Sequence, residues 1–373
     1  MDIRTQFNKI NTGQKAWLEA FEKVYSDSVT AMKREKLTMK IAMLPIHTDK
    51  NRYNNVSPYD QNRVILEKKN NVNTDYINAS PVAVSQASRN YILSQGPVPD
   101  SLTDFWQMVF ENNVPCIVML NRLYEGRSLK CEMYYPNKDK KEVCFKNYTI
   151  TLLSEEEKEY FVVRKLKAND GEKTMELFQI QYTEWPDFGV PESTAAFLDM
   201  LNYIKGLNVL SIEDSDPPTI VHCSAGIGRS GTFVLVDSVL RMIELGVPQS
   251  EISVHDLLID MRCQRFGLVQ TGQQLRFAWQ AIVDGSSEKL VKESINPAVD
   301  PTAQDVCKKR RSESQEDPED RLSKRREVIS QMVAKSRAAE AKRQSTGSLV
   351  QAVFMGGAVA VSAVLAYYFY NKK

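Results

Sequence analysis

The segment 221–232 constrains the fold more than any other part of the chain. Cys223 is followed, after five small or apolar residues, by Arg229 and Ser230. An apolar run at 219–221 predicts a buried strand, and an apolar segment at 232–245, closed by Gly246, predicts a helix. We therefore expect a strand, a tight loop and a helix to follow one another around Cys223.

Such a turn has a chemical consequence. Backbone N–H groups and the positive end of a helix dipole gather around one point, where an anion of phosphate size can bind. A thiol at that point is favoured as its thiolate, and the planar fork of Arg229 can hold two phosphate oxygens. The alternative is a buried structural cysteine beside an ordinary turn. The small residues at 224–226, the glycine at 228 and the arginine favour a loop that binds a phosphate and attacks it.

Composition limits the other possibilities. With 373 residues, the chain is long enough for two domains or for one large domain with appendages. Its formal net charge of +1 provides no general attraction to nucleic acid. Six cysteines without CxxC pairs and only three histidines argue against a metal site and a disulfide framework. Residues 1–10 are polar and carry no secretory signal, so we expect a reducing, cytosol-facing compartment.

The periodicity of apolar residues predicts an α/β (α+β) fold in one large domain, residues 1–287, with a central twisted mixed sheet flanked by helices. Helical patterns occur before residue 45 and near 105–109, 195–204, 252–261 and 273–283. A buried strand is predicted at 116–120, and antiparallel strands at 141–153, 160–166 and 175–182.

The composition changes after this domain. Residues 288–347 are polar, with few large apolar side chains, and we expect a largely disordered linker. Its basic clusters at 308–311 and 324–326 fit either a bipartite nuclear signal or a polybasic segment held near anionic lipid.

Residues 348–371 form a third region. The stretch 349–370 carries no charge and is long enough to cross a hydrocarbon core of roughly 30 Å as a helix. Tyrosines gather near its end, as in an interfacial aromatic belt. A buried core helix is the alternative, but a terminal segment after a polar linker has no core to join. We therefore predict a C-terminal transmembrane anchor with the rest of the chain on the cytosolic side.

The segment 221–232 as a whole resembles the signature of the classical protein tyrosine phosphatases. Further hallmarks of that family follow in its usual order at 51–53 (Asn-Arg-Tyr), 75–79 (Asp-Tyr-Ile-Asn-Ala), 95–97 (Gln-Gly-Pro), 185–189 (Trp-Pro-Asp-Phe-Gly) and 270–271 (Gln-Thr). The resemblance covers residues 5 to 285. The segments 119–122 and 128–131, the basic linker and the C-terminal stretch resemble the non-receptor 1B and T-cell phosphatase subfamily.

This resemblance implies a protein-tyrosine-phosphatase that needs no cofactor. The Cys223 thiolate would attack phosphorus and form a cysteinyl-phosphate, while Arg229 and the loop N–H groups stabilise the phosphoryl oxygens. Asp187 would protonate the leaving phenolate from a lid at 185–189, although an ordinary turn aspartate would also suit Trp-Pro-Asp. The resemblance also implies roles for Gln270 in positioning water, Ser230 in expelling the thiolate, Glu125 in bracing Arg229 and His222 in support of the loop.

The same resemblance implies a deep slot for phosphotyrosine. Tyr53 would stack on the phenyl ring, and phosphoserine would be too short to reach the base. A core aromatic is the alternative for Tyr53, but its polar surroundings in the sequence weigh against it. Lys130 would orient the lid. The other residues assigned to substrate binding are Asn55, Val56, Phe188, Ser224, Ala225, Gly226, Ile227, Gly228 and Gln274.

Two features depart from the family pattern. Relatives carry Arg-Asp after the loop tyrosine, whereas this chain has Asn54 and Asn55. We therefore expect weaker anchoring of the substrate peptide and less preference for acidic flanks. A second phosphotyrosine pocket would use Arg262 and Gly267, but its arginine partner is not identified by the sequence, and Arg34 is only one candidate.

Three functions remain to be compared. The first is an active phosphatase that acts on phosphotyrosine proteins, including receptor and non-receptor kinases, at the cytoplasmic face of the endoplasmic reticulum membrane. The mitochondrial outer membrane and the nucleus are the alternative locations. The second is a catalytically silent phosphotyrosine-binding module, and the third is a dual-specificity phosphatase. We also expect reversible oxidation of Cys223.

Overall fold

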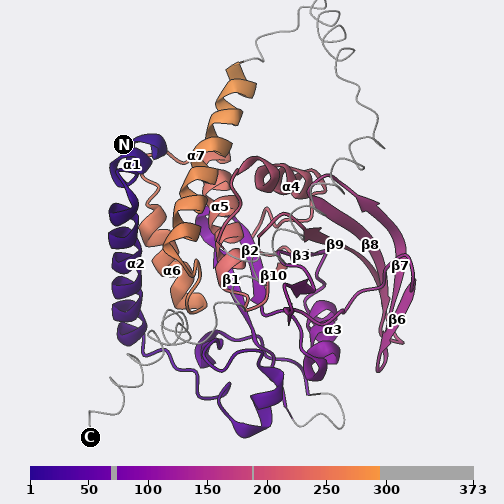
Figure 1. The fold of residues 1–373 in the computed structure, drawn as a ribbon. Coiled ribbons are helices and arrows are strands. Elements are labelled where there is room, and N and C mark those ends of the chain that lie inside the picture. Colours follow the sequence, from indigo (N-terminus) through magenta and orange to yellow (C-terminus); the bar gives the residue numbers. More distant parts are fainter. Residues whose placement is uncertain (69–73, 187–188, 295–373) are drawn as a thin grey trace, which may run out of the picture. The chain divides into compact units, whose positions relative to one another are not determined.

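The computed structural model describes residues 1–68, 74–186 and 189–294. They lie in the first of two compact units, Met1–Ile295. This unit is built around an eight-stranded sheet with helices on both faces (Figure 1). Its helices are α1 (Ile3–Ile10), α2 (Gln14–Arg34), α3 (Leu102–Glu111), α4 (Ala195–Gly206), α5 (Gly228–Glu244), α6 (Val254–Gln264) and α7 (Gly272–Ser294).

The strands follow the order β1-β2-β10-β3-β9-β8-β7-β6 across the sheet. Their bounds are β1 (Ala79–Val84), β2 (Arg89–Ser94), β3 (Cys116–Met119), β6 (Glu142–Phe145), β7 (Tyr148–Glu157), β8 (Phe161–Asn169), β9 (Thr174–Tyr182) and β10 (Thr219–His222). Strand β10 lies between β2 and β3 and is parallel to both, and β3 is also parallel to β9. The pairs β1–β2, β9–β8, β8–β7 and β7–β6 are antiparallel. The predicted mixed sheet is therefore confirmed. In such sheets, ligands bind beyond the carboxyl ends of the parallel strands, which is where β10 leads into Cys223.

Side chains of the central strands alternate between two cores. In β3, Val118 belongs to the core that contains the apolar residues of α4, α5 and α7, whereas Ile117 and Met119 belong to the core beneath α3. The same alternation separates Val221 from Ile220 in β10. This strand is buried on both faces, and its continuous apolar run reflects that position.

Several boundaries differ from those predicted. The helix after the cysteine loop begins at Gly228 and not at 232, because its first turn faces the loop and carries no apolar pattern. The segment 141–153 contains β6 and the start of β7, joined by a turn. Helix α2 ends at Arg34, where Lys36 adopts a left-handed φ of 53° and Leu37 N–H donates to Met32 O (3.1 Å). Helix α7 runs through the predicted boundary at 287 to Ser294.

Within the described residues, no helix combines the length and the apolar character needed to cross a membrane. The predicted anchor at 348–371 and the linker from residue 295 onward lie outside the described residues.

Candidate active site

The loop between β10 and α5 wraps closely around the sulfur of Cys223. Gly226 adopts a left-handed φ of 70°, and its N–H donates to Cys223 Sγ at 3.3 Å. A Cβ atom at this position would lie 2.0 Å from the carbonyl oxygen of Ser94, so only glycine fits. Because α5 begins directly after the loop, the positive end of its dipole points to the same place. The backbone around Cys223 thus has the strand, tight loop and helix start that were predicted for an anion site.

A buried arginine that the sequence did not single out braces this loop from behind. Arg265 donates to the carbonyl oxygens of Gly226 (2.8 Å) and Ala225 (3.3 Å). Its other contacts are Asn78 Oδ1 (2.9 Å) and Ser80 Oγ (3.2 Å). Its burial lowers the pKa of Arg265 to about 10. These contacts hold the loop in the conformation in which the Gly226 N–H points at the sulfur.

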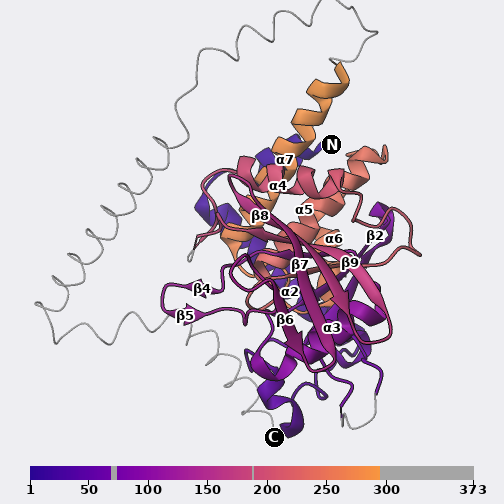
Figure 2. The ribbon, with the colours of Figure 1, turned by 90° about the vertical axis from the view of Figure 1, so that its right-hand side faces the viewer.

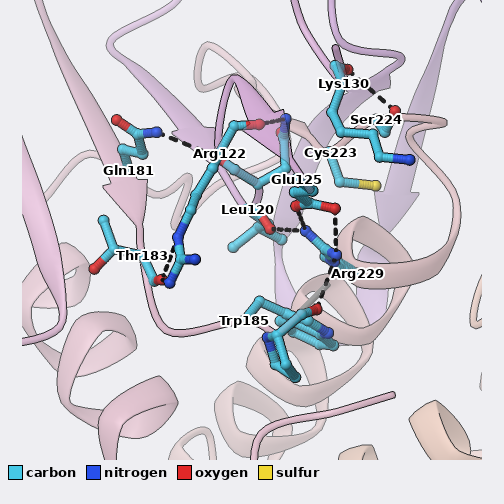
Figure 3. Close-up of polar contacts among 12 residues, drawn as sticks. Leu120, Arg122, Glu125, Lys130, Gln181, Thr183, Trp185, Cys223, Ser224 and Arg229 are labelled. Carbon is cyan, nitrogen blue, oxygen red and sulfur yellow. Dashed lines mark hydrogen bonds and ion pairs between the residues drawn. The ribbon is translucent and has the colours of Figure 1, made fainter. Parts of the chain in front are cut away.

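Arg229 lies in the first turn of α5 and is held on several sides. Its two Nη atoms pair with both carboxylate oxygens of Glu125, with Nη2 at 2.9 Å from Oε2. Nη1 also donates to Leu120 O (3.1 Å), and Nη2 donates to Pro186 O (3.2 Å) (Figure 3). The guanidinium lies 5.6 Å from the centre of the Trp185 ring. The planar fork is therefore fixed beside Cys223 before any substrate binds.

Glu125 is placed by a short hairpin, β4 (Tyr124–Glu125) and β5 (Ser128–Leu129), which Figure 2 shows at the side of the sheet. Gly126 at its tip has a φ of 59°, as the first position of a type II′ turn requires. The hairpin buries Glu125 and leaves Tyr124 exposed. Lys130 follows β5, and its carbonyl oxygen accepts a hydrogen bond from Ser224 Oγ at 3.1 Å. The hairpin thus connects to both Arg229 and the cysteine loop.

Tyr53 also contacts the cysteine loop and lines the cavity beside it. Its hydroxyl lies 2.8 Å from Ser224 Oγ, and the ring is only partly buried. The loop that carries Tyr53 is fixed by Asn51 Oδ1, which accepts hydrogen bonds from Tyr76 (2.6 Å) and Asn78 (2.9 Å). Since Asn78 also contacts Arg265, the two loops share one polar network.

These elements enclose a cavity of about 420 Å³. It is lined by Tyr53, Asn55, Val56, Glu125, Lys130, Gly189, Cys223, Ser224, Ala225, Gly228, Arg229, Gln270, Thr271, Gln273 and Gln274. Most of the predicted site residues therefore converge, although their individual roles stay predictions. Gly226, Ile227, Ser230 and His222 lie in the loop or behind it and do not line the cavity. Asp187 and Phe188 lie outside the described residues. Gln273 was missed, because a glutamine near a helix start gives no signal in the sequence.

The two glutamines at the rim depend on a second glycine. A Cβ at Gly228 would lie 2.9 Å from both amide atoms of Gln274 and 3.2 Å from Gln270 Oε1. The Gln274 side chain accepts a hydrogen bond from the N–H of Gln270 (2.8 Å). Gly228 therefore allows both glutamines to lie over the start of α5, next to Cys223.

Ser230 and His222 lie beneath the loop. Ser230 is fully buried, and within the described part of the chain its hydroxyl has no hydrogen-bond partner. The hydroxyl makes no hydrogen bond to Cys223 Sγ, and the role that the resemblance implies for Ser230 stays a prediction. His222 Nε2 lies 2.8 Å from the Tyr134 hydroxyl, and its Nδ1 lies 3.3 Å from Cys223 O. Burial lowers the pKa of His222 to about 4, so the ring is neutral near pH 7.

This neutral histidine makes stability depend on pH. In the unfolded chain His222 would titrate near 6.5 and in the folded chain near 4, so its contribution is complete above pH 6.5 and is lost as the pH falls toward 4. The loss amounts to at most about 3 kcal/mol. We expect the free energy of unfolding in urea to drop less between pH 7 and pH 4.5 in His222→Gln than in the wild type. Equal drops in both proteins would contradict this expectation.

The two arginines considered for a second phosphotyrosine pocket have other partners in the structure. Arg262 is buried and donates to the carbonyl oxygens of Leu268 and Val269, both at 2.7 Å. Arg34 forms an exposed pair with Glu35 at 2.9 Å. The second phosphotyrosine pocket stays a prediction.

Comparison with known proteins gives the same class as the geometry. The family model described as protein-tyrosine phosphatase matches residues 47–284. Human tyrosine-protein phosphatase non-receptor type 2 is 39% identical over 315 residues, which is 80% of this chain and 72% of the relative. The mouse protein of the same type is 42% identical, over 70% of this chain and 66% of its own length. Drosophila melanogaster tyrosine-protein phosphatase non-receptor type 61F is 42% identical over 64% of this chain and 44% of its own length.

The chain belongs to the protein-tyrosine phosphatase family. Within that family it is similar to the non-receptor enzymes of the 1B and T-cell subfamily, which confirms the resemblance drawn from its motifs. Its activity is that of a protein-tyrosine phosphatase.

Proposed function

We propose that the chain hydrolyses phosphotyrosine in proteins through a cysteinyl-phosphate on Cys223. The thiolate sulfur forms a bond to phosphorus while the bond between phosphorus and the tyrosine oxygen breaks, and the leaving phenolate takes a proton from Asp187. Water held by Gln270 then attacks phosphorus and gives its proton to Asp187. The sulfur–phosphorus bond breaks, and inorganic phosphate and the thiolate are released.

One observation carries this proposal. The Gly226 N–H donates to Cys223 Sγ at the start of α5, and the Arg229 fork is held beside it by Glu125. Donors that are fixed before the reaction stabilise the charge that develops on the phosphoryl oxygens at no further cost of reorganisation. The partly buried ring of Tyr53 at the wall of the cavity supports selection of an aryl phosphate.

The test is hydrolysis of p-nitrophenyl phosphate and of peptides that carry phosphotyrosine, phosphoserine or phosphothreonine. We expect turnover of the aryl phosphates alone, and its loss in Cys223→Ser. A wild-type protein that binds phosphotyrosine peptides without turnover would be a silent binding module. Comparable hydrolysis of phosphoserine peptides would indicate a dual-specificity enzyme.

Asn55 should weaken peptide anchoring. Its side chain is exposed at the cavity, where an aspartate would present two charged acceptor oxygens to the backbone N–H groups of the peptide. We expect Asn55→Asp to lower the KM for phosphotyrosine peptides about 3- to 10-fold, as exchanging a neutral for a charge-assisted hydrogen bond, a difference of about 1 kcal/mol, would. The KM for p-nitrophenyl phosphate, which has no peptide backbone, is the internal control. An unchanged peptide KM would refute this role.

We further propose that residues 348–371 hold the enzyme at the cytoplasmic face of the endoplasmic reticulum. The support is the uncharged stretch 349–370 and the subfamily resemblance. Val361→Lys places a charge in the middle of that stretch, which costs about 3 kcal/mol on insertion. The full-length protein should then leave the membrane fraction, whereas Ser362→Ala should stay. Wild-type protein in the soluble fraction, in mitochondria or in the nucleus would exclude the proposal.

Receptor and non-receptor kinases are the proposed substrates. Asp187→Ala should retain phosphotyrosine proteins on an otherwise intact loop, because it removes the proton donor and leaves Cys223 and Arg229 in place. Vanadate should release the captured proteins, and an absence of kinases among them would exclude this substrate class. Reversible oxidation of Cys223 stays a prediction, and peroxide inactivation that thiol does not reverse would contradict it.

A further inference from the structure

The turn that precedes Gln270 contains a strained residue. Val269 has a φ of 58°, which is the left-handed region, and its β-branched side chain is fully buried. This conformation is a marked outlier for valine and persists only where the surroundings impose it. Strain of this kind concentrates at functional sites, so the contacts that impose it are of interest.

Arg262, from α6, holds one side of this turn. Its Nε donates to Leu268 O and its Nη2 to Val269 O, both at 2.7 Å. Nη1 lies 3.3 Å from Ser28 Oγ in α2, and the guanidinium lies 5.6 Å from the centre of the Phe21 ring. Among the described residues, no carboxylate forms a salt bridge with Arg262, and burial lowers its pKa to about 10. Burial of a cation without a carboxylate partner costs folding free energy. The main structural effect of Arg262 is that it fixes the carbonyl oxygens of Leu268 and Val269.

The start of α5 holds the other side. Val269 N–H donates to Ile227 O at 3.0 Å, and Ile227 is the last residue of the cysteine loop. A Cβ at Gly231 would lie 2.5 Å from the backbone nitrogen of Val269, so the helix and the turn are in close backbone contact. The turn is therefore clamped between Arg262 and the cysteine loop, and Gln270 extends from it into the cavity.

We propose that Arg262 is a positioning residue for the second chemical step. By holding the carbonyl oxygens of Leu268 and Val269, it keeps Val269 in the left-handed conformation, and this places the Gln270 amide over Gly228 beside Cys223. The proposal rests on the proposed role of Gln270 in positioning water. Formation of the cysteinyl-phosphate uses Cys223 and Arg229 and does not require this turn.

The two steps can be separated by rapid-mixing kinetics with p-nitrophenyl phosphate. In Arg262→Lys the charge remains, but an ammonium cannot span both carbonyl oxygens with the fixed geometry of a guanidinium. We expect kcat to fall about 10- to 100-fold, as for loss of a positioned catalytic group. The ratio kcat/KM, which reports the first step, should stay within about threefold. A burst of p-nitrophenol larger than that of the wild type should mark the accumulated phosphoenzyme.

A second substitution tests whether the backbone conformation is the cause. Glycine adopts a positive φ freely and alanine does not. Val269→Gly should therefore restore part of the kcat of Arg262→Lys, whereas Val269→Ala, which removes nearly the same side-chain volume, should not. Arg241→Lys, at an arginine paired with Glu244 on α5, is the control for a lysine substitution away from the turn.

Two results would overturn the proposal. One is a parallel loss of kcat and kcat/KM without a burst, which a merely structural arginine would give. The other is rescue by alanine as good as that by glycine. Gln270→Ala is measured alongside and should also give a burst. If Gln270→Ala gives no burst and Cys223→Ser is inactive, Gln270 does not position the water, and the proposal for Arg262 is refuted. The phosphatase reaction on Cys223 would still be supported by the inactivity of Cys223→Ser.

Discussion

Arg229→Lys should lower kcat by about a thousandfold or more, the largest effect we expect from a conservative substitution. The two Nη groups of the arginine donate to Glu125, Leu120 O and Pro186 O, which fixes the plane of the guanidinium and leaves its Nε–H free of these partners. An ammonium group carries the same charge but has only three N–H donors, so it cannot keep these contacts and also donate to a phosphoryl oxygen. Most of the loss should appear in kcat, because the contact is strongest in the transition state.

The measurement is steady-state hydrolysis of p-nitrophenyl phosphate and of a phosphotyrosine peptide, with circular dichroism as a check of folding. Glu125→Gln provides a graded comparison, since it keeps hydrogen-bond acceptance through one oxygen and removes the charge. Its loss of kcat should be smaller than that of Arg229→Lys. If the kcat of Arg229→Lys were within tenfold of the wild-type value, a positive charge at this position would suffice for catalysis and the planar guanidinium would not be needed.

Gly226→Ala should abolish activity and destabilise the fold by about 3 kcal/mol or more, since it combines backbone strain with overpacking. The new Cβ would lie 2.0 Å from Ser94 O and 2.7 Å from Gln95 N, which are backbone atoms that cannot move aside. The loop would have to leave its contact with β2, and the Gly226 N–H would leave the sulfur.

The variant Gly246→Ala separates the effect of backbone strain at positive φ from the effect of the steric clash with Ser94. Gly246 has a φ of 79°, close to the 70° of Gly226, but no atom lies within 4 Å of its hypothetical Cβ. It should cost only about 1–2 kcal/mol in unfolding free energy and leave kcat unchanged. A similar loss of stability in both variants would mean that the contact with Ser94 is unimportant.

The sequence was most informative where local chemistry and local structure coincide. The strand, loop and helix around Cys223 could be predicted, because an apolar run, small residues and an arginine follow one another within a few positions. The phosphatase class followed from the resemblance of this segment and of further motifs to one family, and the structure brings Cys223, Arg229 and Tyr53 to one cavity. The Trp-Pro-Asp segment gave the acid as a prediction, and that residue lies outside the described part of the chain.

Residues that act through backbone carbonyls could not be predicted. Arg262 was considered only for a second phosphotyrosine pocket and Arg265 not at all, yet they hold main-chain oxygens of the turn at 268–269 and of the cysteine loop. Main-chain atoms carry no identity in a sequence, so such contacts leave no pattern. The start of α5 was misplaced for a related reason, since Gly228 and Arg229 face the site and not the core.

The central position of β10 has a consequence for how the enzyme unfolds and loses phosphate binding. Ile220 to His222 lie opposite residues of β2 on one side and of β3 on the other, and the strand is fully buried. Amide hydrogens here should exchange with solvent only when the whole domain unfolds, whereas those of β1 and β6 at the sheet edges can exchange by local fraying. During heating, phosphate binding should therefore persist until the cooperative transition and then disappear together with the sheet.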